Sequence, residues 1–318
     1  MSQTDQLIAD FVRYDQLIAA PLRDARMPRP TSETDATLQA ERGGAVFASA
    51  LAGSIDVAAV DRLVELSAAV SARPEELAQL AVVDAAGHAR PVYRPLLIYA
   101  WLMSYRVAYE TLPPGTFGRW DEALRPWCDL LESELGGPIS ISETVTPAIR
   151  GGSAAEAAWT ALALHAAGKI FVRDAWTDLA ADTFGRLSRG QRESGAFLLA
   201  TPSDNPEPMW YHELAILHAA ASYAVQAEDR TVARAVARSA TFVLNEIEPD
   251  HATAQPWGLF AFIWHAPARP LADQLLHAVE MRRGLDAAAA AAVDGVSLIL
   301  LADALYCLRL FTEPESKP

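Results

Sequence analysis

The stretch WYHELAILHAAASYAV, residues 210–225, decides the fold. It opens with the aromatic and polar residues Trp210 to Glu213 and then continues with alanine and leucine on every helical face. A helix that is apolar all round must be surrounded by other elements. Segments of this kind recur along the chain, so they predict a set of inner helices at residues 93–109, 154–170, 210–225, 251–264 and 294–311.

Amphipathic segments follow three of these inner helices, at residues 174–190, 229–247 and 269–284. Each has one apolar stripe and therefore one face in water. The later inner segments begin about every 40–55 residues, and repetition on that scale indicates helical hairpins. Inner helices that are fully covered by an outer ring favour closure, and strand patterns are nearly absent. We therefore predict an all-α fold, an α/α toroid of about five to six hairpins.

The chain divides into three parts in this interpretation. Residues 1–35 are expected to form an N-terminal helix and a proline-rich linker, and residues 36–312 the toroid domain. Residues 313–318 are expected to be a disordered tail.

Charge and composition narrow the class of partner. The 318-residue chain is 51% hydrophobic and carries a net charge of −14, which disfavours nucleic acid and anionic membrane surfaces. No apolar run reaches the roughly 20 residues that a membrane helix needs. Two cysteines in apolar helical runs and no signal pattern predict a cytoplasmic protein. The expected partner is a small-molecule substrate, and the sequence sets no oligomeric state.

Two local patterns resemble a known superfamily. In LSRGQRESGAFL, residues 187–198, the order Gln191, Gly195, Phe197 resembles the Gln-Gly-aromatic repeat of terpenoid cyclases, with Phe197 where Trp is usual. The stretches YHELAILHAAASYA and DGVSLILL are similar to inner-helix starts of protein prenyltransferase β subunits. The resemblance covers about residues 90–311. It implies an α/α toroid in which the glutamine side chain ties consecutive hairpins together. Val296 stands where those subunits have their zinc-binding cysteine.

Polar residues gather where the inner helices begin, which in a toroid is one rim of the central cavity. We predict catalytic roles for five of them: His212, Glu213, His251, Asp250 and Tyr211. Substrate contacts are predicted for rim residues and for aromatic residues of the cavity wall: Trp210, Trp257, Gln255, Asn205, Trp159 and Tyr99. The alternative interpretations are structural: a hydrogen-bonded histidine at a helix start, or an acid that suits a helix N-terminus.

A zinc ion is a possible cofactor at this rim. His212, His251 and Asp294 would supply three ligands and leave a fourth position open, as catalytic zinc sites do. Asp294 is also a good helix N-cap. The HExxH zinc motif is absent because residue 216 is Ile216, and His218 lies about 240° round the helix from His212.

Asp303 lies among leucines and alanines in a helix that should be fully covered. A charge in that position must be paired or hydrogen-bonded. It is either a cavity acid or, more commonly in such a setting, the buried partner of an arginine or an indole. His218 is expected in the core, and His165 is expected near a helix C-terminus, where histidine is ordinary.

The first functional hypothesis is a cavity enzyme that performs acid–base chemistry, namely cyclisation, isomerisation or elimination, on a small and largely uncharged substrate. The second is a carbohydrate lyase or glycosidase on the same fold. It requires carboxylates about 5–10 Å apart, or a set such as His212, Tyr211 and Asn205. The third is a non-catalytic binding or scaffold toroid.

Overall fold

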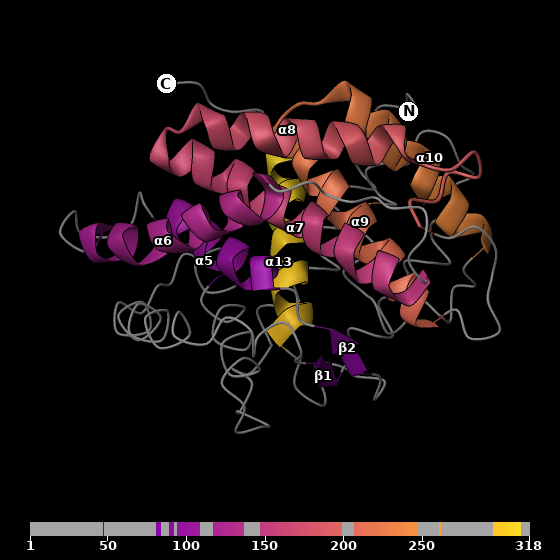
Figure 1. Cartoon of the computed structure of the whole chain (residues 1–318), viewed down its shortest axis with the longest axis horizontal. Helices are drawn as coiled ribbons and strands as arrows, with labels where there is room; N and C mark the ends of the chain where they lie inside the picture. The colour runs from indigo at the N-terminus through magenta and orange to yellow at the C-terminus, as the bar shows by residue number, and fades with distance from the viewer. Residues whose placement is uncertain are drawn as a thin grey trace.

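The computed structural model of the chain describes residues 47, 81–83, 89–91, 94–108, 117–136, 147–198, 207–246, 261 and 295–312 (Figure 1). These residues form helices and one short hairpin. The helices are α5 (Arg94–Ala108), α6 (Phe117–Gly136), α7 (Pro147–Phe171), α8 (Asp174–Arg189), α9 (Glu207–Gln226), α10 (Arg230–Glu246) and α13 (Gly295–Thr312). The strands are β1 (Ala81–Val83) and β2 (Ala89–Pro91).

The predicted helical class is confirmed for the described residues, with the β hairpin as an addition. β1 and β2 pair antiparallel, with Val82 opposite Arg90. Strands of three residues are too short to show an alternating pattern, which explains why the sequence did not reveal them. The predicted boundaries at residues 35 and 313 lie outside the described residues.

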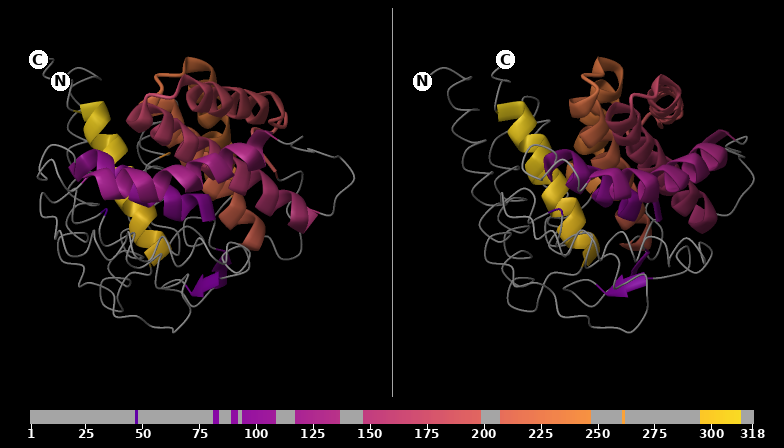
Figure 2. Two further views of the ribbon diagram at one scale, coloured as in Figure 1. Left: turned by 60° about the vertical axis from the view of Figure 1, so that its left-hand side comes forward. Right: turned by 90° about the vertical axis from the view of Figure 1, so that its left-hand side faces the viewer.

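Both kinds of helix occur among the described residues, whereas the predicted segments 251–264 and 269–284 lie outside them apart from residue 261. α7 and α9 are buried on all sides over most of their length, and the described side chains from Ile299 to Leu305 of α13 are buried too. α8 and α10 each bury one stripe, which in α10 comprises Val232, Val236, Ala240 and Val243. α8 packs on α7 and α10 packs on α9, so each amphipathic helix covers the inner helix before it. The two views of Figure 2 place α13 along one flank of the bundle, away from α8.

Both complete hairpins turn in the same way. After α7, the backbone N–H of Arg173 donates to the carbonyl oxygen of Gly168 (2.9 Å), and after α9 that of Asp229 donates to Ala224 (3.1 Å). In each case the residue immediately before the donor has a left-handed φ, 53° at Val172 and 54° at Glu228. This is the Schellman C-cap geometry, which usually selects glycine. The repeated turn confirms two hairpins of one type, and closure into a ring stays a prediction.

Gln191 ties these two hairpins together. Its side-chain amide donates to the carbonyl oxygen of Gly195 (2.7 Å) and to that of Ala235 in α10 (2.8 Å). Gly195 has a φ of 98°, and a Cβ there would lie 2.5 Å from the carbonyl oxygen of Arg238, so only glycine fits. The contact expected of Gln191 is therefore made.

Within the part of the chain that is described, no helix is long and apolar enough to cross a bilayer.

Candidate functional site

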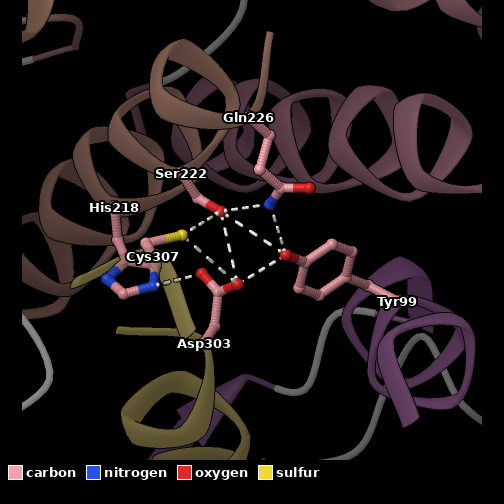
Figure 3. Close-up of polar contacts among 6 residues, drawn as sticks. All are labelled: Tyr99, His218, Ser222, Gln226, Asp303 and Cys307. Atoms are coloured by element: carbon pink, nitrogen blue, oxygen red, sulfur yellow. Dashed lines mark hydrogen bonds and ion pairs between the residues drawn. The ribbon is translucent and has the colours of Figure 1, made fainter. Parts of the chain in front are cut away.

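A buried polar group joins the three helices α5, α9 and α13 (Figure 3). We call it the Asp303 cluster; its members are Tyr99 of α5, His218, Ser222 and Gln226 of α9, and Asp303 and Cys307 of α13. Spacings of four residues place the α9 members on one helical face and the α13 members on another. All except Gln226 are 0% exposed.

The Asp303 carboxylate holds this cluster together. Its Oδ1 accepts hydrogen bonds from the Tyr99 hydroxyl (2.5 Å) and the Ser222 hydroxyl (3.3 Å). Its Oδ2 lies 2.9 Å from Nε2 of His218. A buried carboxylate is tolerated only when such partners replace water. Both oxygens of the carboxylate therefore bond to side chains rather than to backbone groups.

The hydroxyls of Tyr99 and Ser222 are oriented by a single donor, Gln226. Its side-chain amide donates to the Tyr99 oxygen (2.8 Å) and to the Ser222 oxygen (2.9 Å). Each hydroxyl that accepts from Gln226 can direct its own proton at Asp303. The Ser222 oxygen also lies 3.3 Å from the Cys307 sulfur.

Burial keeps the neutral acids of this cluster protonated. It raises the pKa of the Tyr99 phenol well above its ordinary value, and the nearby Asp303 charge raises it further. The same two causes raise the pKa of the Cys307 thiol. A thiol without thiolate character is a weak nucleophile. Both groups therefore stay protonated, and the Tyr99 hydroxyl donates its hydrogen bond to Asp303.

Trp159 of α7 forms an aromatic wall beside the cluster. Its ring stacks on His218, with centroids 5.9 Å apart, and meets Tyr99 edge to face at 5.8 Å. Two buried polar atoms next to the cluster, Nε1 of Trp159 and Oε1 of Gln226, have no hydrogen-bond partner among the described residues. Buried polar groups are nearly always hydrogen-bonded, so these atoms mark a place for a water molecule or a ligand.

The predicted rim residues of α9 lie at a different place. Trp210 and Tyr211 are buried, and His212 is half-buried. Glu213 is 0% exposed, and its two oxygens accept the backbone N–H groups of Phe197 (2.6 Å) and Leu198 (2.9 Å). Ser239 of α10 contributes a longer contact of 3.5 Å. Glu213 therefore holds the segment after α8 against the start of α9, which is a structural task.

The other rim residues lie outside the described part of the chain: Asn205, Asp250, His251, Gln255, Trp257 and Asp294. Of the predicted zinc ligands, only His212 has a described position. Within the described helices, no group of three or more His, Cys, Asp and Glu residues has the geometry to hold a metal ion.

The sequence identified part of this cluster. Asp303 was recognised as a buried charge, and Tyr99 and Trp159 as wall residues. The expected partner of Asp303, an arginine or an indole, was wrong: the carboxylate bonds to a phenol and an imidazole. Ser222 and Gln226 were missed, although polar residues at four-residue spacing from His218 were a visible signal.

Comparison with known proteins identifies no relative: no family model, curated protein or solved structure matches this chain. The functional argument therefore depends on the chemistry of the Asp303 cluster. That chemistry consists of a buried carboxylate between a proton-donating phenol and an imidazole.

Proposed function

We propose that the chain is an enzyme that performs acid–base chemistry at the Asp303 cluster on a small, largely uncharged substrate. The observation that carries the proposal is the bonding of Asp303 to Tyr99 on one oxygen and to His218 on the other, with all three side chains fully buried. Titratable side chains that converge in a protein interior, here with the pKa of Tyr99 raised by burial, are a frequent mark of active sites.

His218 has the setting of a general base. The Asp303 carboxylate accepts the Nε2–H of the imidazole, which selects the tautomer and orients the ring. The second ring nitrogen points away from the carboxylate (Figure 3). A general base that a buried carboxylate holds in position increases the rate of a proton-transfer step by about 10²–10⁴-fold.

Tyr99 complements this base as the acid. In an elimination, His218 removes a proton from carbon, the C–H electron pair forms a double bond, and the adjacent C–O bond breaks. The departing oxygen takes the phenolic proton of Tyr99 and leaves as water. The Asp303 carboxylate, bonded to both groups, then passes the proton gained by His218 back to Tyr99. No cofactor or co-reactant is consumed in this sequence.

The two unpartnered polar atoms support the substrate class. Nε1–H of Trp159 needs an acceptor, and Oε1 of Gln226 needs a donor. A hydroxyl group can act as either partner. The surrounding aromatic rings suit an apolar carbon skeleton. A small alcohol therefore fits the cluster better than a charged molecule does.

We also propose the closed α/α toroid and its terpenoid-cyclase-like character. The tie made by Gln191 between hairpins and the repeated hairpin turn support this architecture. In this arrangement the rim residues would surround the entrance of the cavity. The zinc-assisted version, with His212, His251 and Asp294 as ligands, predicts metal in the purified protein that is lost in His212→Ala.

The carbohydrate lyase or glycosidase remains the alternative enzyme. A glycosidase needs two carboxylates with free oxygens facing one substrate. Glu213, the other fully buried carboxylate of the described helices, is bonded to backbone amides on both oxygens. The scaffold alternative requires that the Asp303 cluster only fixes how α5, α9 and α13 pack.

The experiment is turnover of a panel of small alcohols by the full-length protein in deuterated water, followed by mass spectrometry. The wild type is compared with Asp303→Asn and His218→Gln. The control is Thr183→Val, which removes a buried hydroxyl of α8 that bonds to the carbonyl oxygen of Leu179. We expect dehydration or solvent-deuterium incorporation in the wild type and the control, and about a 100-fold loss in the two cluster variants.

Two results contradict the proposal. One is a rate in Asp303→Asn within twofold of the wild type. The other is no conversion and no deuterium incorporation for any alcohol of the panel, together with lowered stability in both cluster variants, which is the outcome expected of a scaffold.

A further inference from the structure

His165 of α7 is a buried polar side chain that the acid–base site does not use. It is 3% exposed, and neither of its ring nitrogens has a hydrogen-bond partner among the described residues. Its one close ring contact is with the edge of Tyr223, at a centroid distance of 5.1 Å. A buried imidazole without any partner is rare, and it points to a water, ion or ligand that binds there.

Two cations lie close enough to this imidazole for their charges to lower its pKa, and one of them, Arg106, also lies over the Tyr306 ring at 5.7 Å. Lys169 follows it by one helical turn on α7, and Arg106 comes from the last turn of α5. No ion pair joins either cation to a carboxylate in the described part of the chain, although the whole chain carries a net charge of −14. Lys169 is exposed, whereas His165 is buried.

Helix dipoles account for the cations but not for His165. Positive side chains near helix C-termini are favourable by themselves. The same dipole opposes an anion near the end of α7, so two cations are needed to hold one there. The unpartnered imidazole of His165 gains nothing from the dipole while it is neutral.

We propose that His165, Lys169 and Arg106 form a binding site for an oxyanion, a phosphate or carboxylate group of a small ligand. The imidazole donates a hydrogen bond to an anion oxygen, and the two cations balance its charge. The Tyr223 ring closes one side. This site goes beyond the proposed acid–base reaction and does not require it.

The charge balance predicts that binding takes up a proton. Burial, and then the charges of Lys169 and Arg106, lower the pKa of His165 to about 4, so the imidazole is neutral without a ligand. An anion reverses the effect of the two cations and favours the protonated ring. The neighbouring phenols, Tyr223 and Tyr306, have pKa values raised to about 12 chiefly by burial, so they stay neutral. Linkage therefore makes an anion that keeps its charge in this range, such as inorganic phosphate, bind more tightly as the pH falls toward 4.

The test is a pH titration of the full-length protein by NMR with labelled histidine, in chloride buffer and with added inorganic phosphate. We expect phosphate to raise the pKa of His165 by one unit or more, which corresponds to at least tenfold tighter binding at low pH. Acetate in a parallel titration separates a site for carboxylates from a site for phosphates. A larger shift with acetate assigns the site to carboxylates.

Matched variants locate the effect. Lys169→Met with Arg106→Met should weaken phosphate binding at least tenfold. The control, Arg186→Met, removes a cation of α8 that is paired with Asp182 at the surface, and it should leave binding unchanged. The proposal is overturned if neither anion shifts the His165 resonance, or if the double variant binds phosphate as the wild type does.

Discussion

Glu213 and Asp303 are both fully buried carboxylates, on helices that pack against each other, yet their partners differ. Glu213 accepts two backbone N–H groups, from Phe197 and Leu198. Asp303 accepts side-chain donors, Tyr99 and Ser222, and lies at hydrogen-bond distance from His218. Equal burial therefore does not imply an equal role.

The difference lies in what the partners are able to do. A backbone amide does not give up its proton, so the two amide contacts of Glu213 hold the chain in place. A phenol and an imidazole exchange protons, so the Asp303 contacts can take part in a reaction. Burial identifies an important carboxylate, and the chemistry of its partners identifies its role.

The largest effect is expected at the structural carboxylate. Glu213→Gln leaves one of the two amides facing an NH₂ group instead of a charged oxygen. Loss of a charge-assisted bond and an unsatisfied donor should lower the free energy of unfolding by about 3 kcal/mol. Urea denaturation measures this, with the exposed Glu246→Gln as control. A loss of less than 1 kcal/mol would contradict the structural role of Glu213.

Acid should destabilise the fold because the buried His165 takes up a proton on unfolding. This contribution must be subtracted from the measured pH dependence of stability before the two carboxylates are compared. The pKa of His165 is lowered from 6.5 to about 4, so the unfolded state binds more protons between these pH values. Stability is full above pH 6.5 and falls as the pH drops toward 4, by about 3 kcal/mol in total.

Denaturation at a series of pH values, without oxyanions in the buffer, measures this loss. His165→Gln should flatten the profile between pH 4 and 6.5. The acid sensitivity that remains in this variant then belongs to the other titratable groups, the carboxylates among them. An unchanged profile in His165→Gln would show that its imidazole titrates normally.

A smaller loss of stability is expected in the Asp303 cluster. Tyr99→Phe keeps the ring and removes a hydroxyl, while Asp303 retains Ser222 and His218. We expect about 1 kcal/mol of destabilisation together with about a 100-fold loss of turnover. Thermal unfolding and the alcohol assay measure the two quantities. A loss of 3 kcal/mol with unchanged turnover would make Asp303 structural, as Glu213 is.

The smallest effect is expected in the turn between α7 and α8, and the variant made there serves as a control. Val172 is β-branched, 87% exposed and left-handed in φ, and it contacts neither site. Val172→Gly should relieve steric strain and raise stability by about 0.5 kcal/mol after the entropy loss of glycine. Thermal unfolding checks the gain. A destabilised variant would show that the turn depends on the valine side chain.

The cluster was only partly visible in the sequence because each residue was judged on its own helix. The leucines around Asp303 showed that its charge must be satisfied, but not by which residue. Tyr99 is 204 residues away from it along the chain, and His218 is 85 away. The rim hypothesis expected Glu213 at a helix start, but α9 begins at Glu207, and the amides that bind Glu213 belong to the segment after the preceding helix.

The sequence by itself determined the helical class and the alternation of buried and amphipathic helices, whereas the tie at Gln191 was implied by the resemblance to a Gln-Gly-aromatic repeat. The helical class and the alternation depend on hydrophobic periodicity and local chemistry, which can be read from each helical segment separately. Only the tertiary structure decided which donors reach each buried carboxylate. That choice depends on how α5, α9 and α13 pack, and no local pattern encodes the distance between side chains on different helices.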